Sequence, residues 1–223
     1  MNTLSERLSL IASLIPKGVS VCDVGTDHGY LPAALYLSGG FSAVTATDVC
    51  EKPIKNAQRN LKKLGAQGVR LICCDGLSQV ERKAADYVVI AGMGGDVISG
   101  IIDRCPYKNE ITFILQPMTN AKALRVYLNG NGFDISYETA IKENNKLYSV
   151  MVCSFKGQVP YLNEAQKLIG SIKNDSAVNR EYIEKQYNIC KKCADAIKNI
   201  PEKEEEFSEH SKAIIILEKL LEA

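Results

Sequence analysis

The chain has 223 residues, 46% of them hydrophobic, a length that favours one medium domain with an appendage over two equal domains. Its 27 lysines and arginines nearly balance 26 acidic residues, so any attraction to RNA must come from local clusters of charge. No apolar run approaches the roughly 20 residues of a membrane span, and the N-terminal stretch lacks a signal-peptide cleavage site. We therefore expect a cytoplasmic protein without membrane segments, whose eight cysteines are reduced thiols.

The first 157 residues alternate between strand and helix patterns. Apolar residues recur at helical spacing over 4–15, and Thr3 with Glu6 has the spacing of a capping box. Strand patterns follow at 19–25, 43–49, 69–76, 85–95 and 111–118, and helical patterns at 31–40, 51–65, 96–105 and 119–133. Such alternation predicts an α/β fold with a parallel sheet covered by helices on both faces. Two further strands over 133–155, joined at the polar KENNK, are predicted to close the sheet as a hairpin.

Beyond Gly157 the pattern becomes helical. From Leu162 to Ile200 the core-type positions recur in steps of 3 and 4, the spacing of a coiled-coil seam, and Pro201 ends the run. A second run over 207–221 repeats these steps, which predicts an antiparallel helical hairpin. Ser176 can cap a new helix, so the first run can be two pieces. The expected domains are therefore 1–157 and 158–223.

One acidic residue follows each of the first three predicted strands. These are Asp23, Asp48 and Asp75, and because parallel strands share their carboxyl edge, we expect them to converge where open α/β sheets bind ligands. Asp48 can accept from both hydroxyls of a ribose, although it can equally cap the following helix. Asp75 can accept from the amine of a purine, and Gly76 leaves room for the ring. The set suits an adenosine that carries a positive centre and no phosphate, which describes S-adenosylmethionine.

The turn after the first strand combines glycines with polar side chains. Its candidate cofactor-binding residues are Asp23, Gly25, Thr26, Asp27, His28 and Gly29. The glycines let the backbone approach a ligand closely, although an ordinary tight turn would also use them. The turn lacks the G-x-G-x-x-G spacing that holds a pyrophosphate, and its carboxylates favour a cation. We interpret His28 as a residue that hydrogen-bonds the backbone of this turn and performs no proton chemistry.

The motifs DVGTDHGYLP, ATDV, CCDG and AGMGG, followed by LQP, resemble those of class I S-adenosylmethionine-dependent methyltransferases, and most closely the bacterial tRNA (adenine-22-N1)-methyltransferases of the TrmK family. The resemblance implies a Rossmann-like sheet, S-adenosylmethionine as cofactor, tRNA as partner and methyl transfer to N1 of an adenine. It also implies that the C-terminal hairpin contacts tRNA. In this family's pattern Gly25 and Gly29 face the methionine part, Asp48 the ribose, and Val49 and Asp75 the adenine, while Gly92 borders the methyl-transfer site.

Methyl transfer to N1 of adenine needs alignment and exclusion of water more than a strong base. Asp27 is the candidate for stabilising the positive charge of the methylated ring, and Tyr30 is the candidate for stacking on the base, with a core position as its alternative. Further candidate substrate contacts are Met93 in AGMGG, and Gln116 and Asn120 after the fifth strand. Asn120 can instead cap the next helix. The D/N-P-P-Y/F motif of N6-methyltransferases is absent from the position of AGMGG, which disfavours transfer to N6.

Two other clusters have simpler explanations. Cys190 and Cys193 of the CKKC motif fall on the helical seam without a second ligand pair, so we expect no metal. Lys191–Lys192 and the basic stretch 62–70 are candidates for phosphate contacts, although solvated helix surface is the default explanation that we favour. Two alternative functions remain: the same cofactor with a small-molecule or protein acceptor, and a catalytically silent RNA- or protein-binding module. We expect a monomer.

Overall fold

The computed structural model describes residues 4–222. The expected capping box of Thr3 and Glu6 involves a residue outside this range. The first helix, α1 Glu6–Ser13, begins at Ser5, whose hydroxyl accepts a hydrogen bond from the backbone N–H of Leu8. None of the helices in this range is both long and apolar enough to cross a membrane. All eight cysteines are free thiols, as predicted.

Seven strands form one sheet in the order β3-β2-β1-β4-β5-β7-β6. They are β1 Ser20–Val24, β2 Ala43–Asp48, β3 Arg70–Cys73, β4 Tyr87–Gly94, β5 Thr112–Thr119, β6 Phe133–Glu143 and β7 Lys146–Phe155. The first five strands are parallel, and β7 pairs antiparallel with both β5 and β6. This arrangement confirms the predicted α/β sheet closed by a hairpin.

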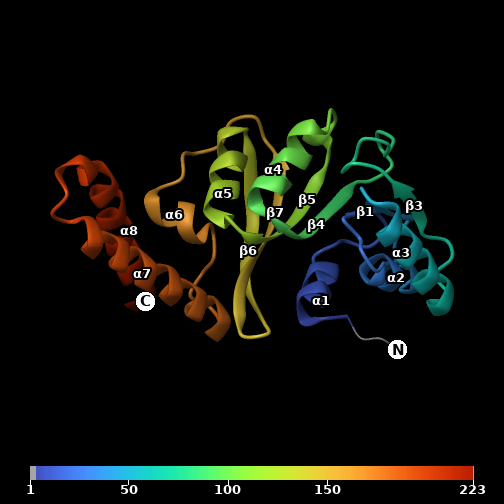
Figure 1. The fold of residues 1–223 in the computed structure, drawn as a ribbon, viewed down its shortest axis with the longest axis horizontal. Helices are drawn as coiled ribbons and strands as arrows, with labels where there is room; N and C mark the ends of the chain where they lie inside the picture. Colours follow the sequence, from blue (N-terminus) through green and yellow to red (C-terminus); the bar gives the residue numbers. More distant parts are fainter. Residues whose placement is uncertain (1–3, 223) are drawn as a thin grey trace.

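Helices cover both faces of the sheet (Figure 1). Besides α1, they are α2 Tyr30–Leu37, α3 Glu51–Leu64, α4 Gly95–Arg104 and α5 Ala121–Gly130. Successive side chains of a strand point to opposite faces, and in β1 Val21 belongs to one hydrophobic cluster while Cys22 belongs to another. The first cluster contains residues of α1, α2 and α3, and the second contains residues of α4 and α5. The two layers of helices bury opposite faces of a largely apolar sheet.

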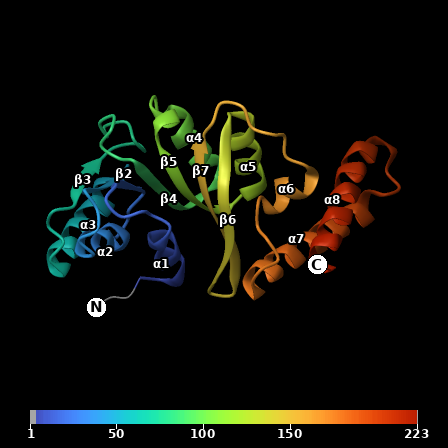
Figure 2. The ribbon, with the colours of Figure 1, turned by 180° about the vertical axis from the view of Figure 1, so that it is seen from behind.

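The C-terminal helices lie beyond the β6 edge of the sheet, at one end of the molecule (Figures 1 and 2). They are α6 Glu164–Ile169, α7 Ala177–Ile197 and α8 Glu204–Glu222, with a 3-10 turn over Pro201–Lys203. The Ser176 hydroxyl accepts from Asn179 N and caps α7, which confirms that the first helical run is two pieces. α7 and α8 pack as the predicted hairpin, and a third hydrophobic cluster joins these helices to Ala140 of β6 and Leu147 of β7.

A fully buried ion pair lies where the sheet meets these helices. Arg125 of α5 and Glu138 of β6 form it, and both side chains are 0% exposed. The Arg125 guanidinium also donates to the Tyr182 hydroxyl of α7 at 3.1 Å and to the Leu168 carbonyl of α6 at 2.7 Å. Burial opposes the charge of Arg125, but the Glu138 carboxylate outweighs it and raises the pKa of Arg125. The expected boundary at residue 157 therefore passes through a shared core.

Candidate active site

The carboxyl ends of β1, β2, β4 and β5 meet at one edge of the sheet. In the parallel register Val24 pairs with Thr47 of β2 and with Ile90 of β4, so the loops that leave these three strands lie side by side. Asp23 is the fourth of the five residues of β1, and Asp48 is the last residue of β2. The order β2-β1-β4 reverses direction between β1 and β4, which is where open α/β sheets bind ligands.

A cavity of about 310 Å³ lies at this edge, between α1 and the turn that joins β1 to α2. The predicted site residues that line it are Asp23, Gly25, Thr26, Asp27, His28, Tyr30 and Gly92. The other predicted residues lie outside its lining: Gly29, Asp48, Val49, Asp75, Gly76, Met93, Gln116 and Asn120. A larger cavity of about 480 Å³ between α3 and β3 is lined without any carboxylate or histidine, so we do not connect it with the site.

The β1–α2 turn is tied down by its neighbours. Gly25 N and Thr26 N both donate to the Thr47 carbonyl, at 2.8 and 3.0 Å. Gly25 has φ +77°, and a β-carbon built there would lie 2.0 Å from Cε of Met93. The left-handed backbone conformation favours glycine at position 25, and any larger residue would also have to displace the terminal methyl of Met93. Met93, near the carboxyl end of β4, therefore lies against the β1–α2 turn.

A buried carboxyl and an unpaired hydroxyl face each other in this turn. Burial raises the pKa of Asp23 to about 6, and the charge of Asp48 adds to the rise. The Thr26 hydroxyl is close enough to oppose that rise, yet Thr26 Oγ1 is buried and makes no hydrogen bond of normal geometry within residues 4–222. A buried polar atom without a partner is costly, and a ligand with amine donors would satisfy both groups. A carboxyl and a hydroxyl that can accept these hydrogen bonds fit the cationic amino-acid end of S-adenosylmethionine.

Asp27, His28 and Tyr30 form the outer wall of the cavity. Nε2 of His28 lies 3.3 Å from Oδ2 of Asp27, and its ring stacks on Tyr30 with centroids 5.6 Å apart. Our expectation that His28 bonds the turn's backbone is wrong, because the structure gives its ring these two side-chain neighbours. The turn is held instead through the His28 carbonyl, which accepts from Asn60 Nδ2 at 3.0 Å. Tyr30, the first residue of α2, is half-buried and lines the cavity, so it is not a core residue.

The residues predicted to hold the adenosine lie along the open edge beside the cavity. Oδ1 of Asp48 accepts from Cys50 N at 3.0 Å, but the N-cap of α3 is Cys50 and no side chain caps this helix, so the alternative role of Asp48 as a helix cap is wrong. The side chain of Asp75 is 57% exposed and Oδ1 accepts from Arg104 at 3.0 Å, so an adenine amine would have to replace or join that partner. Val49 is 66% exposed. Gly76 is buried and its carbonyl accepts from Thr47 Oγ1 at 2.9 Å.

Gln116 and Asn120 have partners that the sequence did not predict. Oε1 of Gln116 accepts from Arg7 Nη1 at 2.7 Å and from Gly92 N at 3.1 Å, and its Nε2 donates to the Pro117 carbonyl at 2.9 Å. With this fully buried amide engaged on both sides, Gln116 fits a role in positioning Gly92 better than direct contact with a base. Asn120 occupies the N-cap position of α5 without a side-chain cap bond, and its Nδ2 donates to Asp96 Oδ2 at 2.6 Å.

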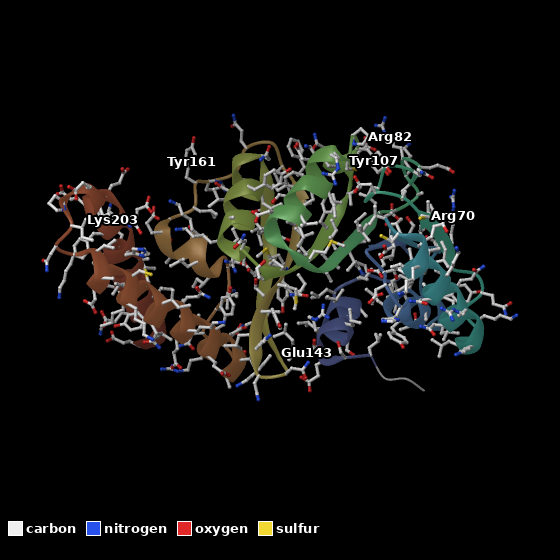
Figure 3. All side chains as sticks on the ribbon, viewed as in Figure 1. Arg70, Arg82, Tyr107, Glu143, Tyr161 and Lys203 are labelled. Atoms are coloured by element: carbon white, nitrogen blue, oxygen red, sulfur yellow. The ribbon has the colours of Figure 1, made fainter. Side chains whose placement is uncertain are left out.

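Arg7 is the residue that sequence reasoning missed. It lines the cavity from α1, and its Nε donates to Glu143 Oε2 at 3.2 Å. Figure 3 shows Glu143 at the end of the β6–β7 hairpin, beside α1. The signal in the sequence was a charged residue within the apolar stripe of the first helix, between Leu4 and Leu8.

Within residues 4–222 no cluster of three or more metal-ligating side chains occurs. In the CKKC motif, Sγ of Cys190 lies 3.0 Å from Nδ1 of His210 on the facing helix α8.

The sheet order and the acidic carboxyl edge define a Rossmann-like methyltransferase fold. Residues 4–151 match the model of the family described as "Methyltransferase domain". The tRNA (adenine(22)-N(1))-methyltransferase of Bacillus subtilis is 33% identical over 154 residues, which are 67% of this chain and 64% of the relative. The chain therefore spans slightly less than two thirds of that relative's length.

Solved structures extend the similarity to the helical domain. The crystal structure of the B. subtilis m1A22 tRNA methyltransferase TrmK is 25% identical, with a TM-score of 0.83 over 99% of this chain and 100% of that chain. The structure of M. capricolum TrmK with S-adenosyl-homocysteine is 27% identical, with a TM-score of 0.78 over 98% of both chains. The chain belongs to the TrmK family of methyltransferases.

Proposed function

We propose that this protein transfers a methyl group from S-adenosylmethionine to N1 of adenine 22 in tRNA. The observation that carries the proposal is that the buried Asp23 carboxyl and the Thr26 hydroxyl, which has no hydrogen-bond partner within residues 4–222, line one cavity at the carboxyl edge of a TrmK-type sheet. The relatives that share this fold are named as methyltransferases of the same tRNA position. The cofactor supplies an activated methyl group, and the protein supplies binding, orientation and electrostatics.

The two ends of the cofactor would bind at different places, one in the cavity and the other along the open carboxyl edge of the sheet. Asp23 and Thr26 would hold the amino-acid part inside the cavity, because one supplies a negative charge and the other a hydroxyl without a partner. Asp48 would accept from the ribose hydroxyls and Asp75 from the adenine amine, along the edge formed by β2 and the β3 loop. Val49, which is exposed beside Asp48, would cover the adenine ring.

The acceptor base would enter from the side of β4 and β5. N1 of a neutral adenine has a free lone pair, so the protein needs to align the base and exclude water rather than remove a proton. Tyr30 lines the cavity and offers a ring for stacking, and Asp27 beside it would stabilise the positive charge of the methylated base. Because a carboxylate only accepts, Asp96 orients the Asn120 amide with its nitrogen toward Asp96, which would leave Oδ1 as an acceptor for the base's amine.

The base must leave its stack to reach this site, at a cost of a few kcal/mol. The helical hairpin of α7 and α8 would contribute by holding the tRNA while the base is extruded. Supporting this role is the attachment of the hairpin to the sheet through the third hydrophobic cluster and through Arg125, which donates to the Tyr182 hydroxyl of α7.

The test combines cofactor binding with mapping of the product. Purified protein is incubated with methyl-labelled S-adenosylmethionine and a tRNA transcript, and the modified base is located by primer extension. We expect one stop at adenine 22, no product from a transcript with guanine there, and loss of product in Asp75→Ala. Glu110→Ala, at an exposed position just before the amino end of β5 and so away from both the site and the hairpin, is the matched control. Binding of the cofactor with no transfer to tRNA would favour another acceptor, and no binding would favour a silent module.

A further inference from the structure

Two cysteines and a histidine lie together in the α7–α8 hairpin, at the end of the molecule beyond β6 (Figure 2). Sγ of Cys190 is 3.0 Å from Nδ1 of His210 and 3.5 Å from its backbone carbonyl. Cys193 follows one turn later on α7, on the same side of the helix as Cys190. Cys190 is buried and Cys193 is half-buried, so an oxidant in solution reaches Cys193 more easily.

His210 is oriented to take a proton from Cys190. Oε1 of Glu206 lies 3.9 Å from Nε2 of His210, and this carboxylate favours the tautomer that carries its proton on Nε2. Nδ1 is then an acceptor for the thiol proton of Cys190. Burial raises the pKa of Cys190, and the charge of Cys193 adds to the rise. Cys190 therefore needs a neighbouring base to become a nucleophile, and His210 is placed to be that base.

The spacing of the two cysteines allows a disulfide only under strain. Side chains three residues apart on a helix are neighbours, with Cβ atoms about 5 to 6 Å apart. A disulfide brings the Cβ atoms to about 3.5 to 4.5 Å, so this turn of α7 would have to tighten. Strain makes a disulfide easier to reduce, which is typical of reversible redox pairs and not of structural cross-links.

We propose that Cys190 and Cys193 form a dithiol that peroxides oxidise reversibly to a disulfide, with His210 as the base for Cys190. The Cys193 thiolate attacks the peroxide: an S–O bond forms, the O–O bond breaks and hydroxide leaves, so the sulfur is oxidised and the peroxide reduced. Cys190 then passes its proton to Nδ1 of His210 and attacks the sulfenic acid, and the S–O bond breaks as the S–S bond forms. In sum, two thiols and one peroxide give one disulfide and two waters, and a dithiol reductant reverses the oxidation.

The disulfide would enclose the lysine pair of the hairpin. Lys191 and Lys192 lie between the two cysteines, and they are the candidate phosphate contacts on α7. Tightening of this turn moves both lysines and draws Cys190 away from His210 on α8. Oxidation would therefore lower the affinity of the hairpin for tRNA, a consequence that rests on the proposed function. The formation of the disulfide does not rest on it.

Trypsin provides the test, because it cleaves after Lys191 and Lys192 and so separates the two cysteines. The full chain is treated with hydrogen peroxide, free thiols are alkylated in urea, and the tryptic peptides are identified by mass spectrometry. We expect a disulfide-linked pair of peptides 186–191 and 193–198, which a dithiol reductant separates. In Cys190→Ser the linked pair is lost, and dimedone should label the sulfenic acid of Cys193. In His210→Gln this labelling should exceed that of wild type by about tenfold, because the second step loses its base.

Cys50→Ser, which removes an exposed thiol outside the hairpin, is the matched control and should leave the yield of the linked pair unchanged. Oxidation of Cys193 to a sulfinic acid while Cys190 is still alkylated would overturn the proposal. So would linkage of Cys193 to another cysteine. Equal dimedone labelling in wild type and His210→Gln would overturn the role of His210 as the base. A linked pair with unchanged tRNA affinity, measured by fluorescence anisotropy, would overturn the effect on tRNA. Absence of methyl transfer by the reduced protein would instead overturn the proposed function and leave the dithiol standing.

Discussion

The ionised side chain of Asp23 is buried, and its charge lowers the free energy of unfolding. Its pKa is 3.8 in the unfolded chain and about 6 in the fold, so between these pH values the folded state binds more protons. Stability therefore falls as pH rises through this window. We expect Asp23→Asn to raise the free energy of unfolding by about 2 to 3 kcal/mol at pH 8 and to change it little below pH about 4. Urea unfolding at the two pH values measures this difference.

The control for this comparison is Asp195→Asn, at an exposed position, which should leave the free energy of unfolding unchanged at either pH. An Asp23→Asn variant that is equally stabilised at pH 4 and pH 8 would show that the gain comes from packing and not from the charge. A destabilised variant at pH 8 would contradict the unfavourable burial of this carboxylate.

The same carboxyl makes cofactor affinity depend on pH. Ionised Asp23 attracts the ammonium of S-adenosylmethionine, and the group is increasingly protonated below its pKa of about 6. We expect the affinity to fall by up to about tenfold for each pH unit below that value and to level off above it. Calorimetric titration between pH 5 and 8 gives the profile. Asp23→Asn should bind weakly with a flat profile, and a pH-dependent profile in that variant would assign the titration to another group.

The junction of α5, β6 and α7 depends on one buried ion pair. Removing a single partner leaves the other charge buried without compensation, which typically costs about 3 to 5 kcal/mol. Arg125→Met would leave Glu138 in that state and would also free the Tyr182 hydroxyl and the Leu168 carbonyl. We therefore expect the free energy of unfolding of Arg125→Met to fall by about 3 to 5 kcal/mol, measured by urea denaturation followed by circular dichroism.

The matched comparison is Arg180→Met, which breaks the ion pair with Glu184 on the exposed face of α7, where the two side chains are 50% and 46% exposed. Solvent screens such pairs, so this change should cost less than about 1 kcal/mol. Similar losses in both variants would mean that the burial of Arg125 does not set the strength of the junction.

The elements were predictable wherever a local pattern decides them. α3 ends at Gly65, which has φ +79°, and Ser176 starts α7, because caps depend on residues close in sequence. Asp23 and Asp48 reach one edge because the carboxyl ends of parallel strands must do so. The Arg7–Gln116–Gly92 contacts could not be predicted, since their partners lie 109 and 24 residues apart and only the packing of α1 against the sheet brings them together. Likewise, nothing near Asp75 in sequence indicates its partner Arg104.

At the scale of the whole molecule, the helical domain is built into the catalytic sheet. The third hydrophobic cluster includes Ala140 and Leu147 of the β6–β7 hairpin, and Asn179 Oδ1 of α7 accepts from Ala140 N at 2.7 Å. Deleting residues 158–223 would expose this cluster and the Arg125–Glu138 pair, so loss of activity in the truncated chain would not identify a tRNA contact. The role of the hairpin has to be tested in the full chain, by changing surface charge alone.

Two exposed lysine pairs allow that test: Lys191–Lys192 on α7 and Lys62–Lys63 at the end of α3. For each phosphate that a protein no longer neutralises, the slope of log affinity against log salt falls by about 0.7 to 0.9. If the hairpin holds tRNA, Lys191→Glu with Lys192→Glu should weaken tRNA binding and reduce this slope by about 1 to 2, while cofactor affinity stays unchanged. Fluorescence anisotropy over a range of salt concentrations measures tRNA affinity and its slope, and calorimetry measures cofactor affinity. A larger decrease in Lys62→Glu with Lys63→Glu would place the tRNA on the opposite end of the molecule and contradict the role proposed for the hairpin.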